Sequence, residues 1–370
     1  MNHRERTLAI LRYQEADRLP IVHFGYWGQT LQKWAAEGHL TQEEASGQAD
    51  GNAIDKAIAA KLGFDYNWQT MCYTNTALLP GFAGEVIREF PDGSRHTRNG
   101  HGVTLLSQPG AGSIPAEIEH LLTDRASWEE HYKWRYQWSP ERVNQDLLQQ
   151  LKDTPRDTPL GLHCGSLFGH LRDVIGIVGI SYLQMDDQAL FREALDAVGD
   201  ICFRNAELAL QTGVDFDFAH FWEDICFKNG PLINPSVFRE CVGPHYKRIT
   251  DLLNANGIDI VSLDCDGCID ALVPIWLENG VNTMFPIEVG TWNASIGPWR
   301  EQYGKDLRGV GGTNKTVFAH DRAAVDAEVE RLKPLVELGG FIPCPDHRIA
   351  PDAKFDLVRY YCERMRATFG

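Results

Sequence analysis

The sequence predicts an α/β protein, specifically a (β/α)₈ TIM barrel with an N-terminal helical extension and a small antiparallel β insertion. Eight short apolar runs have the length and composition of strands, and helical patterns lie between most of them. Parallel strands need helical crossovers of this kind, and eight strand–helix units with an insertion fit a chain of about 350 residues. A doubly wound open sheet is the alternative, but no Gly-x-Gly-x-x-Gly turn follows an early strand.

The N-terminal part supplies the helical extension and the first two strands. Residues 5–13 have apolar side chains at helical spacing, and Pro20 ends that pattern before the strand of residues 21–24. Residues 31–62 are again helical in pattern, and residues 64–68 form the second strand.

Residues 84–108 differ from the rest of the chain because short alternating runs are separated by Pro91-Asp92-Gly93 and Asn99-Gly100. Tight turns between alternating runs predict an antiparallel meander. We interpret it as an insertion in a single domain that spans residues 1–370. Residues 128–152, rich in Trp and Tyr, have a helical pattern.

From Pro159 onward, strands and helices alternate steadily. The predicted strands are residues 160–163, 214–220, 258–263, 281–286, 307–311 and 340–343. The predicted helices are residues 188–212, 236–254, 268–278, 323–338 and 352–369. In such a barrel the active site forms at the carboxyl ends of the strands, so polar residues there are the candidates for function.

The composition disfavours two kinds of partner. A formal net charge of −16 repels nucleic acid and anionic membrane surfaces. No apolar run approaches the roughly 20 residues that span a bilayer, and the charged start of the chain does not resemble a signal peptide. Nine cysteines without a dense framework fit reduced thiols. We therefore expect a cytoplasmic protein that binds small ligands or basic partners.

The strand of residues 258–263 ends in Asp264, Cys265 and Asp266. Because side chains alternate along an extended chain, the two carboxylates point to one face and the thiol to the other. Paired carboxylates hold a cation or push each other's pKa apart, and both outcomes are typical of active sites. Solvated carboxylates in a turn are the alternative interpretation.

Other predicted strand ends carry acidic or imidazole groups. Glu288 is a reasonable further metal ligand, and His347 is a candidate ligand or acid/base group. Glu223 and Asp224 are candidates for orienting the substrate, with capping of the next turn as the alternative.

Aromatic and imidazole side chains near the strand ends are candidates for substrate binding. Trp27, Trp68 and Trp222 would wall a pocket for an aromatic substrate, although tryptophan at strand ends also serves packing. His163 and His220 either bind the substrate or are hydrogen-bonded residues of the core.

These patterns together resemble the uroporphyrinogen decarboxylase superfamily, which contains decarboxylases and the methyltransferases that feed corrinoid proteins. The resemblance covers nearly the whole chain. The matching residues are Arg4-Glu5-Arg6 through Asp17-Arg18-Leu19-Pro20, Gly165-Ser166-Leu167 with Leu171-Arg172 and Gly176, Glu223-Asp224 before Asn229-Gly230-Pro231, and Gly339-Gly340-Phe341-Ile342-Pro343 with His347 and Ala350-Pro351-Asp352.

Departures from the superfamily pattern favour the methyltransferase branch. Porphyrinogen decarboxylases carry arginines after the first strand that hold substrate carboxylates, whereas this chain reads Phe24-Gly25-Tyr26-Trp27. The methyltransferases have a His-x-Cys and a later Cys that bind zinc. Asp264, Asp266 and His347 occupy these three positions here. Carboxylates with one imidazole suit zinc, iron or manganese.

The resemblance implies a metal-dependent methyltransferase that moves a methyl group between a small substrate, such as a methoxylated aromatic, and a corrinoid carried by a partner protein. O-demethylation is then the reaction class, and a homodimer is compatible with the sequence. The residues expected to hold a divalent metal, zinc in the first instance, are Asp264, Asp266, Glu288 and His347. The catalytic candidates are His347, Asp266, Glu223 and Asp224.

Two other functions stay open at the level of the sequence. A decarboxylase or other lyase would use His347 and the paired aspartates without a metal. A non-catalytic barrel would only bind a small molecule, and the fold alone does not choose among these functions.

Overall fold

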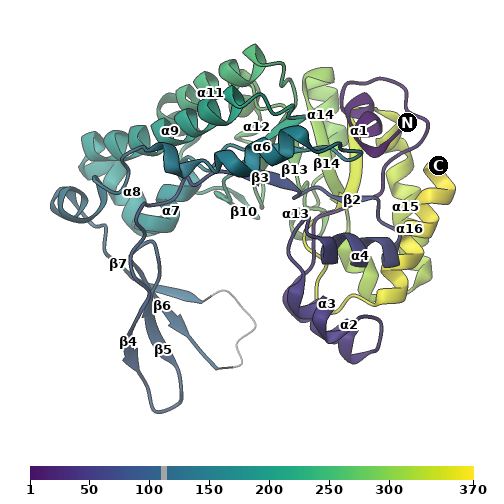
Figure 1. The fold of residues 1–370 in the computed structure, drawn as a ribbon, viewed down its shortest axis with the longest axis horizontal. Helices are drawn as coiled ribbons and strands as arrows, with labels where there is room; N and C mark the ends of the chain where they lie inside the picture. The colour runs from purple at the N-terminus through teal and green to yellow at the C-terminus, as the bar shows by residue number, and fades with distance from the viewer. Residues whose placement is uncertain (110–114) are drawn as a thin grey trace.

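The computed structural model describes residues 1–109 and 115–370. At its centre lies a parallel sheet of seven strands in the order β15, β14, β13, β12, β9, β8 and β3 (Figure 1). Their bounds are Phe341–Pro345, Arg308–Thr313, Thr283–Phe285, Val261–Asp264, Phe218–Trp222, Gly161–His163 and Met71–Tyr73. Because every neighbouring pair is parallel, the carboxyl ends of all seven strands lie at one edge of the sheet.

A separate parallel ladder joins β1 (Val22–His23) to β2 (Tyr66–Asn67). One parallel bridge, between Tyr26 and Ile349, lies just beyond the ends of β1 and β15. In the part of the chain that the structure describes, no ladder joins β1 to β15. The structure therefore shows a mostly parallel α/β sheet, and its closure into a barrel stays a prediction. Each of the eight predicted strand ranges overlaps a strand, and β3 is a further strand of the parallel sheet.

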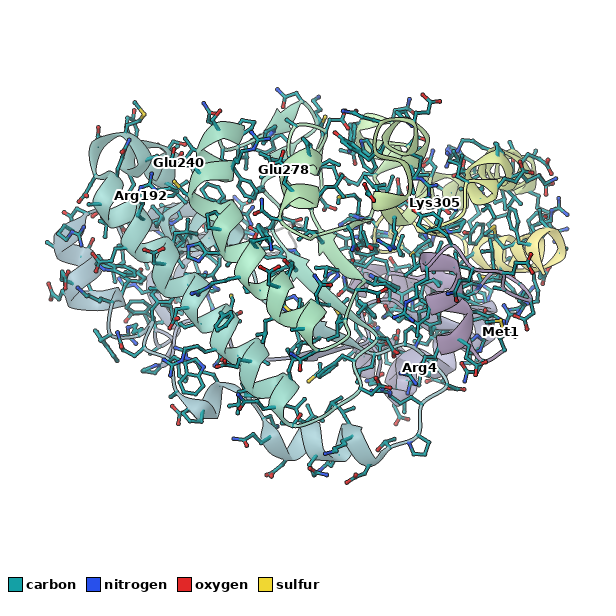
Figure 2. The ribbon with its side chains drawn as sticks, turned by 90° about the horizontal axis from the view of Figure 1, so that it is seen from above. Met1, Arg4, Arg192, Glu240, Glu278 and Lys305 are labelled. Carbon is teal, nitrogen blue, oxygen red and sulfur yellow. The ribbon has the colours of Figure 1, made fainter. Side chains whose placement is uncertain are left out.

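Helices flank the sheet, and Figure 2 shows the layer that carries the labelled residues Arg192, Glu240 and Glu278 in front of the strands. Ion pairs join neighbouring helices of this layer, for example Arg192 Nη2 to Glu240 Oε1 at 2.5 Å. The longer helices are α1 (His3–Leu11), α2 (Gly28–Ala36), α3 (Gln42–Gly47), α4 (Ala53–Leu62), α6 (Gln145–Asp153), α7 (Phe168–Ile175), α8 (Ile177–Asp186), α9 (Gln188–Gln211), α11 (Gly243–Ala255), α12 (Val273–Glu278), α14 (Ile296–Tyr303), α15 (Arg322–Glu337) and α16 (Phe355–Phe369).

The prediction of one helix over residues 128–152 is wrong. The chain instead forms a π-helical turn at Trp128–Tyr132, a 3₁₀ turn at Pro140–Arg142 and then α6. Pro140 has no backbone N–H and cannot continue a helix. The side chain of Asn144 then starts α6 by accepting a hydrogen bond from Leu147 N at 3.0 Å.

The predicted meander is present as an antiparallel sheet of four strands, β4 (Glu85–Glu89), β5 (Arg95–Arg98), β6 (Val103–Ser107) and β7 (Ala116–His120). It extends away from the parallel sheet in Figure 1. The fourth strand, β7, was not predicted, so the expected range of residues 84–108 is too short. That this sheet is an insertion in a single domain stays a prediction. Among the described helices, none is long and apolar enough to cross a membrane.

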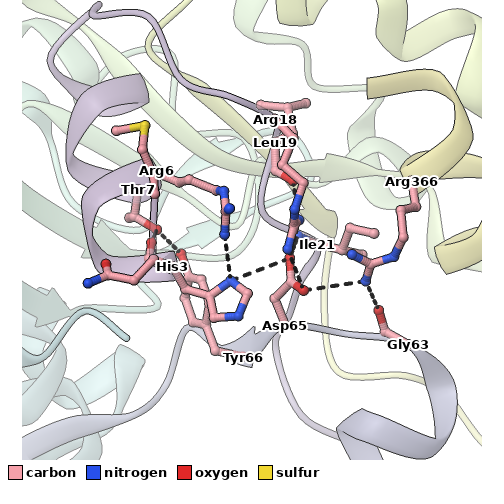
Figure 3. Close-up of polar contacts among 12 residues, drawn as sticks. His3, Arg6, Thr7, Arg18, Leu19, Ile21, Gly63, Asp65, Tyr66 and Arg366 are labelled. Carbon is pink, nitrogen blue, oxygen red and sulfur yellow. Dashed lines mark hydrogen bonds and ion pairs between the residues drawn. The ribbon is translucent and has the colours of Figure 1, made fainter. Parts of the chain in front are cut away.

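The buried carboxylate of Asp65, just before β2, connects three segments of the chain (Figure 3). Asp65 Oδ2 accepts hydrogen bonds from Arg18 Nη1 at 2.6 Å and from Ile21 N at 2.9 Å, and Arg366 Nη2 of α16 lies 3.3 Å from Oδ1. Burial raises the pKa of Asp65, but the bonds from Arg18 and Ile21 outweigh burial, so its pKa lies below the ordinary value.

Replacing this carboxylate is expected to destabilise the fold. We expect Asp65→Asn to lower the free energy of unfolding by about 2 to 3 kcal/mol at neutral pH, because it leaves Arg18 without its buried counter-charge. Urea unfolding measures the difference, with Asp153→Asn, at an exposed position, as the control. Since the pKa is lowered in the folded protein, the difference should shrink as pH falls through that pKa. Equal unfolding midpoints at neutral pH would contradict the assignment.

Candidate active site

A pocket of about 550 Å³ opens at the carboxyl ends of the strands. Its walls come from the carboxyl-terminal parts of β3, β8, β9 and β12 and from the segments that follow β1, β2, β9, β12 and β15. The lining residues are Phe24, Tyr26, Trp27, Gly28, Gln69, Tyr73, His163, His220, Trp222, Asp224, Asp264, Asp266, His347 and Arg348. The pocket therefore combines aromatic walls with a group of acidic side chains.

The acidic group consists of Asp224, Asp264 and Asp266, each of which offers a carboxylate oxygen within 4.8 Å of the others. Asp264 is the last residue of β12, and its Oδ2 accepts a hydrogen bond from Gln69 Nε2 at 3.2 Å. Asp224 has a positive φ of 48°, and its Oδ1 accepts a hydrogen bond from Asp266 N at 3.0 Å. A non-glycine residue in this conformation is uncommon and is found where a site requires it.

Burial and mutual repulsion change how these carboxyl groups titrate. Burial, followed by the charge of Asp266, raises the pKa of Asp224 to about 7. Burial, followed by Asp224 and Asp266, raises the pKa of Asp264 well above its ordinary value. Without a cation, Asp224 and Asp264 therefore tend to retain protons near neutral pH, and these two groups titrate as a coupled pair.

His347 faces the acidic cluster from the segment after β15. Its Nε2 lies 3.3 Å from Asp266 Oδ2, and its ring stacks on Trp27 with centroids 5.9 Å apart and planes 17° apart. Within the described residues, the buried atoms Asp266 Oδ1 and His347 Nδ1 have no hydrogen-bond partner. The structure thus brings Asp264, Asp266 and His347 together, as the sequence predicts, while their roles stay predictions.

Two further imidazoles line the pocket without adding charge. Burial lowers the pKa of His163 to about 4, and burial followed by the nearby His163 lowers that of His220 well below its ordinary value. His220 Nδ1 lies 3.0 Å from Ser262 Oγ, and the ring of His163 stacks on Tyr73 at 4.6 Å. Both imidazoles are therefore neutral at physiological pH and offer hydrogen bonds rather than positive charge.

Glu223 is not among the residues that line the pocket, and its catalytic role stays a prediction. It is fully buried, and its carboxylate accepts hydrogen bonds from Leu167 N at 2.9 Å, Gly169 N at 2.6 Å and the Tyr246 hydroxyl. These donors fix the start of α7 against β9. In this position the buried Glu223 carboxylate has its hydrogen bonds satisfied and stabilises the packing of the surrounding segments.

Two other candidates also lie outside the pocket lining. Glu288 Oε2 accepts a hydrogen bond from Gly267 N at 2.6 Å and Oε1 accepts one from the Thr291 hydroxyl at 2.7 Å, so both oxygens already have partners, and its role as a metal ligand stays a prediction. Trp68 is buried and stacks on Phe218 at 4.4 Å inside the sheet. Trp27 and Trp222, by contrast, line the pocket as predicted.

Six lining residues were not among the predicted site residues: Phe24, Tyr26, Gly28, Gln69, Tyr73 and Arg348. Gln69 lies just after β2, Tyr73 is the last residue of β3, and the Tyr73 hydroxyl donates to Gln69 Oε1 at 3.3 Å. Arg348 is the one Arg or Lys among the lining residues, and it is paired to Asp50 at 2.5 Å. The alternation of side chains beyond Trp68 was the signal that would have found Gln69 and Tyr73.

Comparisons with known proteins find similarity in structure but not in sequence. No family model and no curated protein matches the chain. A methyltransferase from Methanosarcina mazei is similar over 100% of this chain and 99% of its own, with a TM-score of 0.61 and 13% identity. A B12-independent methionine synthase from Shewanella sp. W3-18-1 is similar over 95% and 98%, with a TM-score of 0.51 and 11% identity.

These similarities define the class of fold to which the chain belongs. At such low identity they establish the fold alone, which is the fold of solved enzymes named for methyl transfer. They are consistent with the predicted resemblance at the level of the fold.

Proposed function

We propose that the chain is a metal-dependent methyltransferase that moves a methyl group between a small substrate and a corrinoid carried by a partner protein. The observation that carries the proposal is the cluster of Asp224, Asp264 and Asp266, with His347 beside it, at one end of an aromatic pocket. The fold shared with solved methyl-transfer enzymes supports the same class of reaction.

The residues of this cluster fit a divalent cation. Three carboxylates and one imidazole form an oxygen-rich donor set that suits zinc, iron or manganese, and zinc is the ion we propose first. The unpartnered Asp266 Oδ1 and His347 Nδ1, and the raised pKa values of Asp224 and Asp264, are features that a bound cation would relieve. Cys265 points away, because its Sγ accepts a hydrogen bond from Ile225 N at 3.4 Å.

The chain's own residues would hold and orient the reactants. Asp264, Asp266 and His347, with Asp224, would bind the cation, which when bound would polarise the heteroatom that carries the methyl group. Gln69 fixes the Asp264 carboxylate through its side-chain amide. Trp27 holds the imidazole ring of His347 by stacking, so that its Nε2 stays directed at Asp266.

The pocket walls suggest the kind of substrate. Trp27, Trp222 and Tyr73 supply flat apolar surface, and a volume of about 550 Å³ accommodates a small aromatic molecule. A methoxylated aromatic donor, and hence O-demethylation, is the reaction we propose. The proposal also includes a closed barrel, a single domain over residues 1–370 and a cytoplasmic location.

Metal analysis and a methyl-transfer assay test the proposed function. We expect about one equivalent of zinc or another divalent transition metal per chain, and methylation of cob(I)alamin from a methoxylated aromatic donor. Absence of metal together with release of CO₂ from a carboxylated substrate would support the lyase instead. Tight binding of a methoxylated compound without any methyl transfer would support the non-catalytic binding protein.

The purified protein is expected not to decarboxylate uroporphyrinogen. A tetrapyrrole with many carboxylates needs several cations, whereas Arg348 is the one Arg or Lys that lines this pocket and Asp50 already neutralises it. An assay for coproporphyrinogen, run beside an authentic decarboxylase as the positive control, should show no product above the enzyme-free blank. Enzyme-dependent coproporphyrinogen would overturn the choice of branch.

A further inference from the structure

Helix α8 (Ile177–Asp186) presents three large apolar side chains to solvent. Val178, Tyr182 and Met185 expose 69%, 66% and 79% of their surface. Their spacing places them along one side of the helix, and we call these three residues the α8 face. The opposite side of α8 packs against the core through the buried Ile180 and Leu183. The helix is therefore apolar on both sides, which is unusual for a surface helix without a partner.

The α8 face also lacks charge. Residues 177–185 contain no Asp, Glu, Lys or Arg, whereas the chain as a whole carries a formal net charge of −16. Two copies of so acidic a protein repel each other over most of their surfaces. The uncharged α8 face is a place where two copies approach at a low electrostatic cost.

A groove of about 630 Å³ runs between α8 and β7, next to the α8 face. Its apolar lining includes Ile118, Leu122, Ile175 and Leu183, and Ile118 is itself 48% exposed. The charged residues of its lining are the carboxylates of Glu119, Asp124, Asp186 and Asp187 and the guanidinium of Arg125, so acidic groups predominate. Apolar surface thus continues from the helix into a concavity that has an acidic border.

We propose that the α8 face is the contact surface of a homodimer in which two α8 helices pack antiparallel about a two-fold axis near Tyr182. The spacing of the three residues is nearly symmetric about Tyr182, so the axis would place Tyr182 against its own copy and Val178 against the partner's Met185. In such an isologous contact, both copies contribute the same surface patch. Met185, with its flexible thioether, would then reach toward the partner's groove.

A second copy suits this surface better than a foreign basic segment. A basic amphipathic helix would be attracted by the acidic border of the groove, but the face itself offers no charge with which to pair. For two identical copies, the acidic borders repel and the apolar faces attract. The contact between copies should therefore strengthen when salt screens the borders, whereas binding of a basic partner would weaken.

Sedimentation of the full-length protein at micromolar concentration tests the proposal. We expect a reversible dimer whose dissociation constant falls between about 0.1 M and about 1 M salt. Met185→Glu and Tyr182→Glu should each raise the dissociation constant by about tenfold or more, because each brings a charge into an apolar contact. Phe227→Glu, at an exposed apolar position on β10 (Cys226–Phe227), is the matched control and should dimerise like the parent.

The melting temperature of each variant shows that it is folded, and Met185, which is exposed over most of its surface, can be replaced without touching the core. A cross-linking pair gives a second measurement. Tyr182→Cys should form an intermolecular disulfide on mild oxidation, with two thiols losing two electrons and two protons to an added disulfide oxidant, while Phe227→Cys should not. A parent that stays monomeric at high micromolar concentration, or α8 variants that dimerise as well as the parent, would overturn the proposal.

Discussion

The Asp266→Ala protein is expected to bind a divalent metal at least about a hundredfold more weakly than the parent, and to lose methyl transfer with it. The Asp266 carboxylate supplies one oxygen of the acidic cluster, and its Oδ2 is the group that His347 Nε2 faces at 3.3 Å. Its replacement removes a charged donor and leaves the imidazole without a partner. Metal content and methylation of cob(I)alamin, measured on both proteins, give the two readouts.

The fold of Asp266→Ala should survive. A carboxylate beyond the end of a strand contributes little packing, and its loss removes repulsion with Asp224 and Asp264, so the metal-free variant should melt at or above the temperature of the metal-free parent. Asp306→Ala, at an exposed acidic position outside the cluster, is the control and should keep both metal and activity. A variant of Asp266 with full metal content and full activity would refute this assignment.

The convergence of Asp264, Asp266 and His347 was predictable because it depends on two simple regularities. Side chains alternate along a strand, and the carboxyl ends of parallel strands meet at one edge of a sheet. The run that ends in Asp264 and the last strand, β15, are both strongly apolar, so their ends could be located from the sequence.

That Asp224 joins the cluster, and that Glu288 lies outside the pocket lining, depends on backbone geometry that the sequence pattern does not reveal. Asp224 joins the cluster through a positive φ and a hydrogen bond from the backbone of Asp266. Glu288 turns toward Gly267 N, whose own φ is +86°. Neither conformation has a periodic signature, since each is set by contacts between loops far apart in the sequence.

The fold shows the same division between regular and irregular features. Long helices with clear apolar periodicity, such as α9 and α15, lie within two residues of the predicted ranges. The aromatic stretch of residues 128–152 has helical spacing but contains Pro140. The structure divides it into a π-helical turn, a 3₁₀ turn and helix α6. Strand β3 has three residues, and so short a run does not distinguish a strand from a loop.

The metal-free Asp264→Asn protein is expected to exceed the metal-free parent in stability by about 1 to 3 kcal/mol near pH 8, and to match it near pH 4. Burial, then the charges of Asp224 and Asp266, raises the pKa of Asp264 in the folded protein. The folded state therefore binds this proton more tightly than the unfolded state does. The stability of the parent must fall as pH rises from the ordinary carboxyl pKa toward the raised one.

Asparagine removes that loss because it does not titrate and keeps an oxygen that accepts the hydrogen bond from Gln69 Nε2. Urea unfolding with a chelator at the two pH values measures the effect, and Asp306→Asn, at an exposed position, should match the parent at both. A gain at pH 4 as large as that near pH 8 would assign the effect to packing instead of titration. Saturating zinc should reverse the order near pH 8, because the ion stabilises the folded parent in proportion to its affinity, and the variant has lost one charged ligand.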